Sequence, residues 1–389
     1  MTIASSTSVE TSLDEAVAST TAKVLQDLAG APPHLAFYFA SRHHAPGLED
    51  LTADLVTRLK APHILGCTGE SIIGGSVEYE DRPAFTLWAA SLPGAEIHSG
   101  HVSTEQTPDG CVFLGIPVVP PGPSTMILLG EPFSFPVGVF IQRMKEDNPD
   151  LQVIGGMASA AQSPGENRLF HGRQVCVDGA VAAVIAGNVR VRALVSQGCR
   201  PFGKHLVITK SEGNFIRELG GRPALEKLRD QLNELTIAER GLLNRGLHLG
   251  LAIDARKRQY RRGDFLVRNV MGIGKDDGAI VVTDAVKPGT TVQFHLRDAE
   301  TASEDLQILL REARASGAEP LGALLFSCNG RGRRLFDVVS HDASSVAREL
   351  GGIPVAGFFA AGEIGPVGGQ NFLHGFTASL ALFEQGPFQ

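Results

Sequence analysis

The chain has 389 residues, of which 43% are hydrophobic and 20% charged, and it carries a net charge of −7. This length exceeds the roughly 100 to 200 residues of one ordinary domain, so we expect a globular protein of two domains. The hydrophobic content excludes a largely disordered chain. The negative charge argues against a nucleic-acid partner, because phosphate contacts require concentrated lysine and arginine.

The cysteines and the N-terminal residues predict a cytoplasmic protein. Five cysteines are widely spaced and form no CxxC pair, which is typical of reduced thiols. The first dozen residues lack the apolar segment of a signal peptide. Apolar stretches such as 179–187 are far shorter than the roughly 18 to 20 residues that span a bilayer, so no membrane association is expected. The one basic run, at 256–262, is interpreted as a solvated turn.

Residues 1–30 are expected to form a disordered tail, over residues 1–11, followed by a helix. Ser12 and Glu15 have the spacing of a capping box ahead of apolar residues on one helical face. A first strand is predicted at 34–40. The leucines at 48, 51, 55 and 59 then share one side of a second helix, and a strand at 63–65 follows.

The order of hydrophobic run, helix-compatible stretch, second hydrophobic run and glycine turn occurs three times. The three turns lie at 64–70, 153–159 and 355–363. Each repeat spans roughly 30 residues, the length of a βαβ unit. Parallel strands bring their following loops to one edge of a sheet, where ligands usually bind. The sequence therefore predicts a ligand pocket among these turns.

The stretch between the second and third repeats has a different pattern. Short runs of alternating hydrophobicity at 247–253, 265–267 and 292–296 predict antiparallel strands. Two helices are expected there, one over 225–235 and one starting at a capping box, Thr301 to Glu304. The expected fold class is α/β with mixed α+β elements: two domains of repeated βαβ units with glycine turns, plus an antiparallel insertion in the second half.

Four stretches of the second half resemble the FIST family, whose N and C domains occur together in bacterial signal-transduction proteins and some eukaryotic F-box proteins. They are 263–269, 292–299, 326–332 and 357–365. The first half is similar to the N domain through the turn at 66–70 and the Gly155-Gly156 pair. The resemblance implies a FIST N-like domain over 31–205 and a FIST C-like domain over 206–389.

The same resemblance implies a sensory module for small ligands such as amino acids, with no established reaction of its own. The chain shows no kinase, methyl-accepting or cyclase output domain, so a separate signalling partner protein is expected. Two alternatives remain open: an enzyme that uses a cysteine nucleophile, and a protein-interaction scaffold.

The carboxylates of the turns are the first candidates for ligand binding. Glu70 and Glu363 end comparable turns, where each could hold a ligand amine or cap backbone N–H groups. Arg268 and Arg297 lie on predicted strands, and a planar guanidinium suits a ligand carboxylate. An internal ion pair, for which Asp298 is available to Arg297, is the structural alternative. The remaining turn candidates are Gly66, Thr68, Gly155, Gly156, Gly357 and Gly362.

Cys328 is the candidate nucleophile, because it follows a predicted strand and precedes Asn329 and an arginine-rich loop that includes Arg331. Nearby arginines would favour the thiolate, whereas a buried thiol would be inert. His43 and His44 follow the equivalent strand of the first repeat, and either of them or His341 could serve as base. No histidine shows metal-ligand spacing, and the glycines at 272–274 have the wrong context for a phosphate loop, so neither metal nor cofactor is expected.

Overall fold

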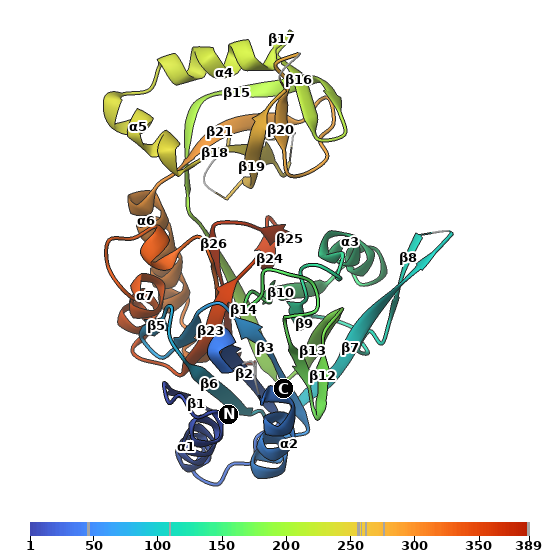
Figure 1. The fold of residues 1–389 in the computed structure, drawn as a ribbon, viewed down its shortest axis with the longest axis vertical. Helices are drawn as coiled ribbons and strands as arrows, with labels where there is room; N and C mark the ends of the chain where they lie inside the picture. The colour runs from blue at the N-terminus through green and yellow to red at the C-terminus, as the bar shows by residue number, and fades with distance from the viewer. Residues whose placement is uncertain are drawn as a thin grey trace. The chain divides into compact units, whose positions relative to one another are not determined.

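The computed structural model describes residues 1–44, 47–108, 110–254, 257, 259–260, 263–274 and 277–386. The chain forms two compact units (Figure 1). Unit 1 contains residues 1–196 and 306–389, and unit 2 contains residues 197–305. Unit 1 is therefore built from both ends of the chain. The arginines of the basic run at 256–262, and the side chain of Leu51, lie outside the described residues.

Each of the three predicted repeats in unit 1 forms a parallel pair of strands joined by a helix, which confirms the βαβ prediction. The helices are α2 (Leu48–Leu59), α3 (Val137–Asp147) and α7 (His341–Leu350). The parallel pairs are β2 (Leu35–Ser41) with β3 (His63–Gly69), β9 (Ser124–Gly130) with β10 (Leu151–Met157), and β22 (Pro320–Cys328) with β23 (Val355–Ala360).

Two further strands extend each pair on the side of its first strand. An antiparallel strand comes first: β6 (Phe85–Ser91), β13 (Ala180–Gly187) or β26 (Thr377–Gln385). Next to it lies β1 (Thr2–Ser8), β7 (Ala95–Thr107) or β14 (Val189–Gln197), respectively. The second sheet alone continues, through β8 (Gly110–Leu114).

The prediction that residues 1–11 are disordered is wrong. All seven residues of β1 pair with β6, from Thr2 opposite Ser91 to Ser8 opposite Phe85. Threonine and isoleucine suit strands, and a largely polar strand is tolerated at a sheet edge. The paired residues are 77 to 89 positions apart in the sequence, so the segment alone contains no sign of this pairing.

A hairpin follows each glycine turn. Each hairpin pairs with the sheet of another repeat and not with the sheet of its own repeat. The hairpin β4 (Ile72–Gly74) and β5 (Val77–Tyr79) pairs with β23 of the third repeat. The hairpin β11 (Leu169–His171) and β12 (Gln174–Cys176) pairs with β3 of the first. The hairpin β24 (Glu363–Val367) and β25 (Gln370–His374) pairs with β10 of the second. The exchange is cyclic, so the three sheets have the same strand order.

The three sheets share one hydrophobic core and carry their helices on the other faces. The first and third sheets contribute aromatic residues to the shared core, where the ring of Trp88 contacts that of Phe383 and the ring of Phe39 contacts that of Phe358. The second sheet contributes aliphatic residues such as Ile154. Outside it, α1 (Leu13–Asp27) and α2 pack on the first sheet, α3 on the second, and α6 (Ala299–Ala315) with α7 on the third. The loops at the strand ends are thereby fixed by a common interior.

Unit 2 is the predicted antiparallel insertion. Its helices are α4 (Ala224–Asn233) and α5 (Ile237–Leu242), and its sheet contains β15 (Cys199–Glu212), β16 (Phe215–Leu219), β17 (Arg222–Pro223), β18 (Leu247–Ala252), β19 (Phe265–Ile273), β20 (Ile280–Val282) and β21 (Thr291–Arg297). The expected capping box at Thr301 is wrong, because α6 begins at Ala299 and Asp298 accepts a hydrogen bond from the Thr301 hydroxyl at 2.5 Å. In the described residues, no helix is both long enough and apolar enough to cross a membrane.

Candidate ligand site at the junction of three turns

The three glycine turns meet at Ser159, the last residue of the second turn. Its backbone N–H donates to the carbonyl of Thr68 in the first turn at 3.2 Å. Its hydroxyl accepts a hydrogen bond from the Glu70 N–H at 2.9 Å and donates to the carbonyl of Phe359 in the third turn. The second and third turns are also joined directly, since Met157 N–H donates to Gly362 O at 2.8 Å. The first and third acidic turns are thus attached to one shared residue.

The turn glycines serve close packing between strands. A Cβ on Gly66, Gly155 or Gly357 would lie 2.2, 1.9 or 1.8 Å from the carbonyl oxygen of the neighbouring parallel strand. These distances are far below van der Waals contact, so only glycine fits. Cβ atoms on Gly156 and Gly362 would meet side chains at 2.9 Å. The repeated glycines therefore have a structural explanation that does not require a ligand.

Glu70 is held by an arginine that the sequence analysis did not select. Arg334 Nη2 donates to Glu70 Oε1 at 2.5 Å and Nη1 donates to Oε2 at 3.1 Å. Nη1 also donates to the carbonyl of Asn329 at 2.9 Å, and hydrogen bonding to Glu70 raises the pKa of Arg334. The side chains of Arg334 and Glu70 are 57% and 19% exposed. This pair joins the first and third repeats at a point that solvent reaches.

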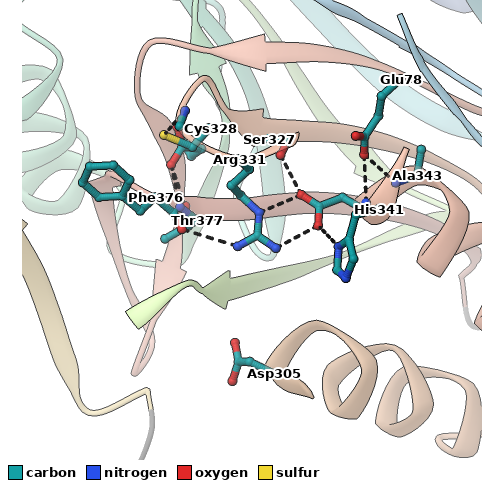
Figure 2. A network of polar contacts seen from close by, with 12 residues as sticks. Glu78, Asp305, Ser327, Cys328, Arg331, His341, Ala343, Phe376 and Thr377 are labelled. Carbon is teal, nitrogen blue, oxygen red and sulfur yellow. Dashed lines mark hydrogen bonds and ion pairs between the residues drawn. The ribbon is translucent and has the colours of Figure 1, made fainter. Parts of the chain in front are cut away.

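Arg331, a predicted ligand residue, is instead buried against Asp342 at the start of α7. Its Nε donates to Asp342 Oδ2 at 2.6 Å and its Nη2 to Oδ1 at 2.8 Å. In Figure 2 the guanidinium lies between Phe376 and the carboxylate that Ser327 and His341 also contact. Burial alone would raise the pKa of Asp342, but the Arg331 charge holds that pKa well below its usual range.

Glu78, on β5, stabilises the start of α7 from another part of the chain. Its Oε1 accepts hydrogen bonds from the N–H groups of Asp342 and Ala343 at 2.8 and 2.9 Å (Figure 2). Helix N-termini leave such N–H groups without intrahelical partners, so this carboxyl replaces a local cap. Burial, and then the charge of Asp342, raise the pKa of Glu78 to about 8.

Glu363 is fully buried and only half satisfied. Its Oε2 accepts hydrogen bonds from the Thr377 N–H at 3.0 Å and the Thr377 hydroxyl at 2.9 Å. Its Oε1 has no hydrogen-bond partner. Burial raises the pKa of Glu363 to about 8 despite these bonds. The carboxyl is therefore mainly protonated at neutral pH.

The expectation that nearby arginines favour the thiolate of Cys328 is wrong. The residue is buried, and its sulfur accepts a hydrogen bond from the Gly330 N–H at 3.4 Å. Burial, and then Glu363, raise the pKa of the thiol well above its usual range, because Arg331 and Arg334 are directed to carboxylates. The thiol stays protonated near neutral pH, which leaves little nucleophile for catalysis.

The histidines considered as bases are placed in structural surroundings of their own. His43 Nδ1 lies 3.4 Å from the Ser41 hydroxyl, and His44 is buried, with its pKa lowered by burial and by His43. His341 stacks on Phe336 with ring centroids 3.5 Å apart, and its Nδ1 lies 2.9 Å from Asp342 Oδ1. His43 and His341 therefore have structural contacts that do not involve the Cys328 sulfur, and His44 is a buried ring.

Arg268 and Arg297 belong to unit 2, whereas the turns belong to unit 1. Arg268 forms an ion pair with Asp284. Asp298, the alternative partner for Arg297, caps α6 and lies 3.8 Å from Arg200. Among the residues that the structure describes, no group of three or more His, Cys, Asp or Glu side chains could hold a metal ion.

Comparisons with known proteins cover nearly the whole chain. Residues 34–222 match the FIST N domain and residues 224–366 match the FIST C domain. An uncharacterized protein of Mycobacterium tuberculosis is 42% identical over 369 residues, which are 95% of this chain and 96% of that protein. An uncharacterized protein of Mycobacterium bovis is 40% identical over 358 residues, 92% of each chain.

Proposed function

The chain belongs to the FIST family, whose domains are in general sensory domains of signal transduction, and we propose that it is a cytoplasmic sensor of a small zwitterionic metabolite such as an amino acid. The observation that carries this proposal is the solvent-reached pair of Glu70 and Arg334 at the junction of the three turns. Neither side chain has a second charged partner among the described ion pairs.

A zwitterion offers both charges that this pair already recognises. The guanidinium fork of Arg334 matches a carboxylate with two parallel hydrogen bonds, as it now matches Glu70. The Glu70 carboxylate can accept from the ligand ammonium in return. An exposed ion pair contributes only about 0 to 1 kcal/mol, so exchanging each partner for a ligand group costs little.

Binding at this point would act on the contact between repeats. Glu70 is fixed through its N–H to Ser159, and Arg334 through the Asn329 carbonyl. A ligand that separates the two side chains changes the ion pair between the first turn and the loop after β22 without disturbing the backbone that supports them. We infer that a separate partner protein receives the resulting change, because FIST domains are sensory rather than effector domains.

Thermal shift measurements with the standard amino acids and related small metabolites test the proposal. A bound ligand stabilises the folded state, by about 2.7 kcal/mol at 100 times its dissociation constant. The shift should disappear in Arg334→Gln and in Glu70→Gln. It should persist in Arg58→Gln, which removes an exposed ion pair of α2 with Asp54. The proposal fails if no compound stabilises the protein, or if Arg334→Gln binds with unchanged affinity.

A further inference from the structure

Among the described residues, the second sheet of unit 1 carries an outer strand, β8, that has no counterpart in the other two sheets. β7 is 13 residues long, compared with 7 for β1 and 9 for β14, and its outer part pairs with β8 from Thr107 opposite Gly110 to Ser103 opposite Leu114. β8 is the terminal strand of its sheet. Figure 1 shows this hairpin extending away from the rest of unit 1. The extension is not needed for the cyclic core, so it requires its own explanation.

The sequence of β8 lacks the features that protect an exposed sheet edge. Its residues, Gly-Cys-Val-Phe-Leu, include no charge and no proline, and the side chains of Val112 and Leu114 are each 42% exposed. Natural edge strands usually carry charged residues, prolines or bulges that prevent pairing with another chain. The corresponding edge strand of the third sheet, β14, carries Arg190 and Arg192. An uncharged apolar edge indicates a surface that is paired.

We propose that β8 pairs antiparallel with β8 of a second copy of this chain, so that the second sheet continues across a two-fold axis. A register centred on Val112 places Leu114 of each copy opposite the other copy's Gly110, and Phe113 opposite Cys111. The two largest side chains, Leu114 and Phe113, then face small ones, and Val112 faces its own counterpart, which limits crowding on both faces. The strand is thus sterically complementary to its own two-fold image, as an isologous interface requires.

The surface beside β8 combines apolar side chains with charges of both signs. A cavity of about 430 Å³ lies between β8 and α3, lined by apolar residues that include Val139, whose side chain is 53% exposed. The same cavity is lined by Arg143 together with Glu146 and Asp147. Arg143 pairs with Asp147 on the same helix at 2.6 Å, so this surface carries both charges, and a partner of one predominant charge would be repelled by part of it. This favours a second copy over a foreign strand.

Analytical ultracentrifugation of the full chain at micromolar concentrations tests the proposal. The wild type should sediment as a dimer of the 41.2 kDa chain. The double variant Val112→Lys with Leu114→Lys should sediment as a monomer, because the lysines charge the edge. Both sites are exposed, so circular dichroism and the melting temperature should show a folded protein. Met271→Lys, at a 66% exposed residue of unit 2, is the control and should remain a dimer. A monomeric wild type, or a dimeric double variant, overturns the proposal.

Cysteine crosslinking tests the register. Directly opposite residues have Cβ atoms about 4.5 to 5.5 Å apart, so a small backbone movement brings them to the roughly 3.5 to 4.5 Å of a disulfide. In a Cys111→Ser background, Val112→Cys should give a crosslinked dimer under mild oxidation, and Leu114→Cys should not. Crosslinking through Leu114→Cys alone overturns the Val112 register, and crosslinking at neither position overturns the β8 pairing.

Discussion

Arg331 and Arg334 lie three residues apart, and each binds a carboxylate through two hydrogen bonds, but the two ion pairs differ in burial. The side chains of Arg331 and Asp342 are 0% and 1% exposed, whereas those of Arg334 and Glu70 are 57% and 19% exposed. Asp342 is further held by Ser327 and His341. The loop that follows β22 therefore contributes one arginine to a buried ion pair and another to a solvent-exposed ion pair.

The difference in burial between the two ion pairs separates a structural pair from a candidate binding pair. Removing one partner of a buried ion pair leaves an uncompensated charge in the interior. Removing one partner of an exposed ion pair costs little, because water solvates the charge that remains. The buried pair fixes the start of α7, together with Glu78. The exposed pair is the one at which ligand binding is proposed. Variants at the two pairs should therefore give opposite results for stability and for binding.

The largest expected effect is that of Asp342→Asn. The change keeps the shape of the side chain but leaves the Arg331 charge buried without its partner, which should destabilise the protein by about 3 to 5 kcal/mol. Unfolding in urea, followed by circular dichroism, measures this loss. Asp54→Asn, in an exposed pair on α2, is the matched control and should cost less than about 1 kcal/mol. Equal losses in the two variants would contradict the assigned difference between buried and exposed pairs.

An intermediate effect is expected for Glu363→Gln, and it depends on pH. The pKa of Glu363 is raised from 4.5 to about 8, so between these values the folded state keeps a proton that the unfolded state releases. Stability contributed by this group is complete below pH 4.5 and is lost as pH rises toward 8, by about 1.4 kcal/mol per pH unit. The glutamine variant should lose this slope, which urea unfolding at several pH values measures.

Glu78→Gln provides the comparison for this slope, because burial and Asp342 raise the pKa of Glu78 to about 8 as well. It should remove a similar slope, because the glutamine carbonyl can still accept the N–H bonds at the start of α7 but the side chain no longer ionises. A Glu363→Gln protein whose stability changes with pH in parallel to the wild type would show that this carboxyl ionises normally.

The buried carboxyl groups of Glu131 and Glu363 differ in the number of hydrogen bonds that they accept. Glu131 Oε2 accepts from the N–H of Phe133 and from the N–H and hydroxyl of Ser134, and its Oε1 accepts from Asn167. Glu363 accepts from the N–H and hydroxyl of Thr377 on Oε2, and its other polar neighbour is the Cys328 thiol. Both acids are fully buried. Burial alone therefore does not identify a functional carboxyl; the number of hydrogen bonds that it receives is needed as well.

The repeats could be predicted from the sequence because their signals are local. Leucine spacing in α2 and the short apolar strands before each glycine turn are visible within about 30 residues. The cyclic exchange of hairpins could not be predicted, because strands as short as Ile72–Gly74 have no periodicity and pair with residues more than 280 positions away. Edge pairing of β1 was missed for the same reason.

The candidate site was predicted less well, because the sequence shows which residues are neighbours along the chain but not where their side chains point. Cys328 is followed by several arginines, yet Arg331 points to Asp342 and Arg334 to Glu70. Glu78 and Asp342 are separated by 264 residues and become neighbours only when β5 packs beside α7. Glu70 was selected from its turn, but its partner required the fold. Its role as a ligand residue stays a prediction.

The smallest effect on stability, and the sharpest test of the comparison, is expected for Arg334→Gln. The variant loses an exposed ion pair, so its free energy of unfolding should fall by less than about 1 kcal/mol. In Arg331→Gln the free energy of unfolding should fall by several times more, because Asp342 is left charged and buried. Urea unfolding of both variants under the same conditions measures the difference. A loss in Arg334→Gln as large as that in Arg331→Gln would mean that the outer pair is part of the scaffold. If stability is retained while ligand stabilisation disappears, the two arginines divide structure from binding within one loop.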